Sequence, residues 1–299
     1  MKKIIVLGLS ICTASVSFAQ QAELAIAKAK YTFSHVLDTN KRDKPYTEEM
    51  LLIIGKNSSL YTSNVRLEQQ INFKKHVAEQ IRNNGGTLNG AQIISNRKRP
   101  TIETDYYIFN QENKFYTVEK LMREYLTEEE IPKIDWKINK DTLTFSGLKC
   151  QKATANFKGR NWIAWFAPEL PFPNGPWKLN GLPGLIVDAY DEKKEVQFKF
   201  AGFEAVKVNP IDLKSATEDE KALTTAMMGN EIRIPVKALK VSAQELNRLK
   251  KAKNDDPYGF AKAQLAGTGM EGLLNITKQS FGNRPVPTAS QFNNPIELK

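Results

Sequence analysis

The chain has 299 residues, of which 41% are hydrophobic and 25% are charged, and its formal net charge is +10. This composition is ordinary for a globular protein, and the length suffices for one large domain or two small ones. The lysines are scattered and form no basic–aromatic repeat of the kind that stacks on bases, so the charge does not predict nucleic-acid binding.

The first 19 residues are predicted to be a cleavable signal peptide, with two early lysines, an apolar run at 4–11 and a small-x-small site ending at Ala19. Cleavage removes both lysines, the only charged residues of this leader, and lowers the net charge from +10 to +8. Lipidation of Cys12 is the alternative, but a lipobox needs a small residue where the bulky Ile11 stands. We therefore expect a periplasmic or secreted protein. No later apolar run approaches the ~18 residues of a membrane helix, so no transmembrane segment is expected in the mature chain.

The mature chain begins with strand patterns that one helix interrupts. Residues 26–37 alternate polar and apolar side chains, 50–55 form a compact apolar run, and a third short strand ends at Tyr61. Apolar residues then recur at helical spacing, which predicts an inserted helix within 62–83. The following residues, up to Pro100, are expected to form a loop-rich excursion.

Short strands resume at intervals of about 8–12 residues, a spacing typical of an antiparallel meander rather than of alternating strands and helices. The predicted strands are 106–109 paired with 114–118, 136–138 paired with 142–145 across a turn at 139–141, and then 150–157, 162–166, 185–190 and 196–203. The predicted fold class is α+β: a mainly antiparallel, curved β-sheet with an inserted helix and a C-terminal helix.

After Pro210 the sequence becomes polar and rich in Ala and Lys. Ser242 and Glu245 form a capping box, which predicts a helix over 243–254 whose exposed face carries Lys250 and Lys253. Gly, Asn, Pro and Gln dominate from 255 onward and predict weak order. The expected organisation is a β-rich domain at 20–210, a helical polar extension at 211–254 and a weakly ordered tail at 255–299.

The segment 150–186 is dense in aromatic, proline and glycine residues. Strand alternation places Arg160 and Trp162 on one face and Trp165 on the other. Four prolines then forbid regular ladder pairing, so 167–180 is expected to be a stiff, extended loop. The residues 181–184 suit a type I turn that leads into a core strand. We expect Cys150, Trp162, Trp165, Pro183 and Leu185 to be largely buried.

These residues resemble the GLPGLI family of exported proteins from Gram-negative bacteria. The similarity rests on the signature Gly181, Leu182, Pro183, Gly184, Leu185 and Ile186, on Cys150, Lys152, Ala153, Phe157, Gly159, Arg160, Trp162, Ala164, Trp165, Phe166, Pro168, Pro171, Gly175, Pro176 and Trp177, on Ile53, Ile54, Gly55, Ser58, Ser59 and Tyr61, and on the ending Asn294, Pro295, Ile296, Glu297 and Leu298. The family has no established activity, so the resemblance supports export and one continuous fold and leaves the function open.

Catalytic motifs are scarce. The sequence has no G-x-S-x-G elbow, H-E-x-x-H motif or P-loop, and no spacing that indicates a metal site or a cofactor. Its two histidines, His35 and His76, are interpreted as a packed residue and a solvated one. After cleavage Cys150 is the sole cysteine, either a buried small hydrophobe, which we favour, or a reactive thiol that pairs with a histidine. Asp188 and Asp191 are a further candidate pair for acid–base chemistry.

Two functional hypotheses follow. The favoured one is a non-catalytic binding, carrier or scaffold protein of the cell envelope, whose partner is another envelope protein, a peptide or an apolar ligand. Its candidate ligand-binding residues are Arg160, Trp162, Trp165 and Trp177, and for Arg160 a structural role beside the proline loop is favoured over ligand binding. The alternative is a peptidase-like hydrolase of cell-envelope material that uses Cys150 or acidic residues.

Overall fold

The computed structural model describes residues 22–83, 102–206, 229–266 and 292–298. The predicted signal peptide and the predicted excursion from residue 84 to Pro100 lie outside these ranges. The strands are β1 (Glu23–Leu24), β2 (Ala27–His35), β3 (Tyr46–Ile54), β4 (Ser58–Ser63), β5 (Thr104–Phe109), β6 (Lys114–Leu121), β7 (Arg123–Glu130), β8 (Lys137–Phe145), β9 (Leu148–Phe157), β10 (Arg160–Ala167), β11 (Leu185–Asp191), β12 (Val196–Ala205), β13 (Glu231–Ile232) and β14 (Leu239–Lys240), and the helices are α1 (Asn64–Asn83), α3 (Ala243–Asp255) and α4 (Pro257–Leu265).

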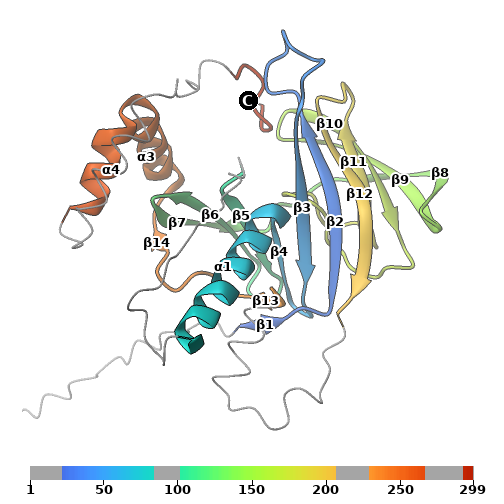
Figure 1. The fold of residues 1–299 in the computed structure, drawn as a ribbon. Coiled ribbons are helices and arrows are strands. Elements are labelled where there is room, and N and C mark those ends of the chain that lie inside the picture. The colour runs from blue at the N-terminus through green and yellow to red at the C-terminus, as the bar shows by residue number, and fades with distance from the viewer. Residues whose placement is uncertain (1–21, 84–101, 207–228, 267–291, 299) are drawn as a thin grey trace, which may run out of the picture.

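Twelve of these strands form one curved sheet in the order β14-β7-β6-β5-β4-β3-β2-β12-β11-β10-β9-β8. Neighbours in the sheet are antiparallel except β14 and β7, and β1 pairs with β13 in a separate two-stranded sheet. Most strands pair with the next strand in sequence, because short turns join many of them. The pairing of β2 with β12 joins the run β2–β7 to the run β8–β12. The predicted α+β fold with an antiparallel, curved sheet, an inserted helix and a C-terminal helix is confirmed (Figure 1).

The main core lies on the inner face of the sheet. Alternation in β2 turns every second residue inward, among them Tyr31 and Phe33, and the same face of β10 contributes Trp162 and Phe166. The loop between β10 and β11 lies against this face, and its residues 174–180 are all buried. Prolines keep this loop out of the ladder, so its apolar side chains are free to fill the concave side of the sheet.

The helices cover other parts of the sheet. α1 packs on β3 and β4, whereas α3 and α4 pack beside β6 and β7 (Figure 1). The side chain of Ser242 accepts a hydrogen bond from the amide of Glu245, as the predicted capping box requires. No helix in the described ranges is long and apolar enough to cross a membrane.

Three local expectations were wrong. The predicted hairpin around residues 139–141 is one strand, β8, because Ile138 and Thr142 both pair with β9 and the residues between them form a bulge. The prediction of weak order after residue 255 is wrong for α4. Asp256 caps this helix, and its residue Phe260 is buried. β7 was not expected at all, since its charged sequence lacks a strand pattern, and it forms because β6 offers a complete ladder.

Candidate functional site

Arg160 begins β10 at one end of the inner core and is 3% exposed. Its Nη1 donates to Asp191 Oδ2 at 2.7 Å and to Glu195 Oε2 at 3.3 Å. Asp191 is fixed in turn, because its Oδ1 accepts the amide of Val196 at 2.8 Å. A buried cation therefore faces two buried carboxylates, which satisfies the rule that charges removed from water must be paired.

The other three donors of Arg160 bind residues 292–298, here named the strap. Nη2 donates to Asn294 Oδ1 at 2.7 Å and to the carbonyl of Pro295 at 2.6 Å, and Nε donates to the carbonyl of Ile296 at 2.8 Å. A guanidinium has five N–H donors, so all of them have acceptors within the chain. Arg160 thus has no donor left for a ligand. The favoured structural role placed Arg160 beside the proline loop, but three of its hydrogen bonds go to the strap instead.

His35 lies beside this ion cluster, and it interacts electrostatically with Arg160, Asp191 and Glu195. Burial lowers the pKa of His35 to about 4, so the imidazole is neutral at ordinary pH, and its Nε2 has no hydrogen-bond partner among the described residues. Burial raises the pKa of Glu195, but hydrogen bonds from Arg42 and Arg160 outweigh burial and hold that pKa below its usual value. The ion cluster therefore lies beside a neutral imidazole.

Trp162 and Trp177 are core residues. They are 1% and 3% exposed, and their ring centroids are 5.6 Å apart. Trp162 Nε1 donates to the carbonyl of Phe157 at 3.1 Å, which satisfies its polar atom inside the core. Trp177 closes the end of this core beside Phe157. Neither ring reaches the surface, so the expectation that they line a ligand site does not hold in this structure.

Trp165 differs from the other three candidates because strand alternation turns it to the opposite, outer face. It is half-buried and packs edge-on against Phe145, with ring centroids 5.9 Å apart. Lys152 and Asp188 stand directly beside it on the neighbouring strands. Burial raises the pKa of Asp188 to about 6, and Lys199 partly opposes this shift. Trp165, expected to be largely buried, is thus the one predicted ligand residue that solvent reaches.

We define the outer face as the side of β9–β11 that carries Lys152, Ile163, Trp165, Asp188 and Tyr190, all of them half-buried. Ile163 and Trp165 lie on the middle strand of this face, and Lys152 and Asp188 lie on the strands to either side of Trp165. The described helices pack on other strands, so this face has no helical cover (Figure 1).

The 181–184 turn is built by its glycines. Gly181 and Gly184 have φ angles of +87° and +153°, which favour glycine, and a Cβ on Gly184 would lie 2.3 Å from the carbonyl oxygen of Ala167. The amide of Gly184 donates to Leu182 O, a γ-turn around Pro183 instead of the expected type I turn. Leu182, Leu185 and Ile186 are buried as structural residues, but Pro183 at the tip is exposed.

Cys150 is 1% exposed, and burial raises the pKa of its thiol. It lies near the start of β9, by the Phe166 end of β10, whereas His35 ends β2, beyond β11 and β12, and lies toward the Arg160 end of β10. The fold does not bring the proposed Cys–His pair together. Asp188 and Asp191 also stay apart, since Asp188 lies beside the outward Trp165 and Asp191 beside the inward Trp162.

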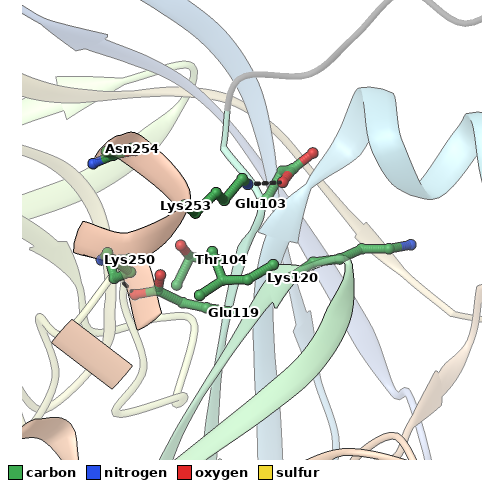
Figure 2. Close-up of a pocket in the computed structure, with 8 residues that line it drawn as sticks. Glu103, Thr104, Glu119, Lys120, Lys250, Lys253 and Asn254 are labelled. Carbon is green, nitrogen blue, oxygen red and sulfur yellow. Dashed lines mark hydrogen bonds and ion pairs between the residues drawn. The ribbon is translucent and has the colours of Figure 1, made fainter. Parts of the chain in front are cut away.

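A charged cleft of roughly 220 Å³ lies between α3 and the β5–β6 edge, and it was not predicted. Figure 2 shows two ion pairs across it: Lys250 to Glu119 at 2.9 Å and Lys253 to Glu103 at 3.6 Å. The only sequence feature that pointed to this cleft was the placement of Lys250 and Lys253 on the exposed face of the predicted helix. Each glutamate already has a lysine partner on α3, so these charges hold α3 against the sheet. Among the described residues no cluster of three or more His, Cys, Asp or Glu side chains could hold a metal.

No protein-family model matches the chain, and no curated protein matches its sequence. Two solved structures of PNGF-II, in space groups P21 and C2, are similar with TM-scores of 0.47 and 0.45, each at 13% sequence identity. The alignments cover 76% and 74% of this chain but 32% of the PNGF-II chain, so this chain spans about a third of the length of the structures it matches.

Proposed function

We propose that this chain is an exported, non-catalytic binding or scaffold protein of the GLPGLI family that contacts its partner through the outer face. The observation that carries the proposal is the different placement of the four candidate residues. Arg160, Trp162 and Trp177 are buried inside the fold. Of the four candidates only Trp165 is accessible to solvent, and it lies on a face that no described helix covers. Aromatic residues flanked by polar ones are typical of protein contact surfaces.

The positions of the reactive groups support binding rather than hydrolysis. The alternative needed either Cys150 with a histidine or a pair of acids. Cys150 is buried with a raised thiol pKa, and it lies by the Phe166 end of β10, whereas His35 lies toward the Arg160 end. A nucleophilic thiol needs a lowered pKa, whereas burial and the nearby carboxylates of Glu169 and Asp188 raise the pKa of Cys150.

The test is binding of the purified mature protein to isolated cell-envelope fractions, measured by co-sedimentation. Trp165→Lys should abolish binding, because it puts a charge in place of the aromatic ring on the outer face. Phe73→Lys is the matched control: Phe73 is an aromatic residue on α1 that is 41% exposed and far from this face. Equal binding by both variants and the native protein would show that the outer face is not the contact surface.

Export is tested separately by mass spectrometry of the protein recovered outside the cytoplasm. We expect a mature chain that begins at Gln20 and carries no lipid. A diacylated Cys12 would contradict this and place the protein on a membrane surface.

A further inference from the structure

The strap lies in its groove as an irregular segment that bends at residues 296–297. The amide of Asn294 donates to the carbonyl of Leu37 at 3.2 Å, and its Nδ2 donates to the carbonyl of Val36 at 2.7 Å. Its Oδ1 accepts from Arg160, so the side chain bonds on both sides and is 4% exposed. This residue type therefore has a specific recognition role at this position, because an aliphatic side chain would leave the groove's donor and acceptor unpaired.

The next residues add a charge match and a close packing contact. Glu297 pairs with Lys178 Nζ at 2.8 Å and with Lys158 Nζ at 3.4 Å, and the Lys178 side chain is only 8% exposed. The amide of Leu298 donates to the carbonyl of Lys158 at 2.9 Å. A Cβ on Gly159 would lie 2.7 Å from Leu298 Cβ, so this strand end needs a glycine to let the strap approach.

The groove is built without α3 and α4, the last two described elements before the strap in the chain. Its walls come from the end of β2 and the residues after it, the β9–β10 turn, and the loop that carries Lys178. The helices α3 and α4 pack instead on β6 and β7 through Leu246 and Phe260. Figure 1 shows the strap at the end of the strands, apart from both helices. The contacts in the groove are therefore the same whichever copy of the chain supplies the strap.

We propose that this groove is a peptide-binding site for an Asn-Pro-apolar-acidic segment, and that a second copy of this chain supplies such a segment by strap exchange. The groove's cations, Arg160, Lys158 and Lys178, fit the carbonyl oxygens and the carboxylate of that segment. Exchange of an identical element is a low-cost route to dimers. The chain's own strap competes for the same groove, so exchange appears at high protein concentration or when the strap is cut.

The first experiment uses the full chain with a specific protease site introduced within 275–285, before and after cutting. The probe is a fluorescein-labelled peptide of residues 290–299, capped at both ends, and binding is followed by anisotropy. The cut protein should bind this peptide at least about a hundredfold more tightly than the uncut protein, because cutting removes the tethered competitor.

Peptide variants test the chemistry. Asn294→Ala and Glu297→Lys peptides should each bind at least about tenfold more weakly, since each loses a charge-assisted contact. The Phe292→Ala peptide is the matched control and should bind unchanged, because Phe292 is 45% exposed. Equal binding of all four peptides, or no binding to a cut protein that keeps its melting transition, would overturn the proposal.

The second experiment needs no cut. Two isotopically distinct batches of the full chain are mixed, unfolded and refolded at high concentration, and examined by native mass spectrometry. We expect mixed dimers that the Glu297→Lys chain does not form. Only monomers from the native chain would refute strap exchange. The outer face takes no part in this contact, so Trp165→Lys should leave the dimers unchanged, which separates this proposal from the proposed function.

Discussion

Replacement of Arg160 by methionine should be among the most destabilising single changes in this protein. Methionine keeps much of the side-chain volume but removes all five hydrogen-bond donors. The carboxylates of Asp191 and Glu195, whose side chains are 4% and 6% exposed, would then lose their buried cation. At the same time the strap loses the three hydrogen bonds that hold Asn294, Pro295 and Ile296.

The magnitude follows from the burial. Removing one partner of a buried ion pair costs about 3–5 kcal/mol, because an uncompensated charge remains in the core. A typical domain is stable by only about 5–15 kcal/mol, so the loss should be a large fraction of the total. Arg42→Met is the matched control. Arg42 also pairs with Glu195, but its side chain is 54% exposed, and such a pair contributes about 0–1 kcal/mol.

The assay is urea denaturation followed by tryptophan fluorescence, together with limited proteolysis of the strap. The Asp191→Asn and Glu195→Gln substitutions, combined with Arg160→Met, should recover part of the loss because they remove the stranded charges. An Arg160→Met protein that loses less than about 1 kcal/mol, with a strap that resists protease as before, would refute the assignment of Arg160 as the brace of the strap.

Further outcomes can be measured on the same purified protein. Gly184→Ala should prevent folding or lower the melting temperature far more than Gly181→Ala, because its Cβ would meet the carbonyl of Ala167, whereas a Cβ on Gly181 meets nothing within 4 Å; equal melting temperatures would contradict the turn geometry. The Cys150 thiol should react with a disulfide reagent slowly in the folded protein and rapidly in urea, and fast reaction in buffer would disprove its burial. His35 is held neutral with a pKa of about 4, below the usual value near 6.5, so the unfolded chain binds the extra proton first as pH falls. Stability should therefore drop between pH 6.5 and 4 by on the order of 3 kcal/mol, and His35→Gln should flatten this part of the pH profile; an unchanged slope would refute the assignment.

The elements with strong local patterns could be predicted. Period-two alternation identified β2, and the capping box located the start of α3 at Ala243. The same alternation correctly separated Trp162 from Trp165, which later distinguished the core from the outer face. These predictions succeeded because the controlling interactions are between residues close in sequence.

The candidate site could be predicted only in part. The sequence singled out Arg160 but not its partners, because Asn294 lies 134 residues away and nothing local links the two. The proline-rich loop was predicted to be a stiff, extended connection, but the sequence did not show which of its residues pack against the sheet. Residues 174–180 are buried because the concave sheet needs apolar side chains to fill it, and that need exists only once the sheet has curved.

The sequence by itself determined the antiparallel meander, the inserted helix, the capped helix and the glycines of the 181–184 turn. Local backbone sterics and hydrophobic periodicity suffice for these features. Only the tertiary structure decided which charges are buried together, which tryptophan faces outward and where the strap lies. These properties depend on which strands are neighbours and on contacts between segments more than a hundred residues apart. Such segments come into contact only when the whole core packs together.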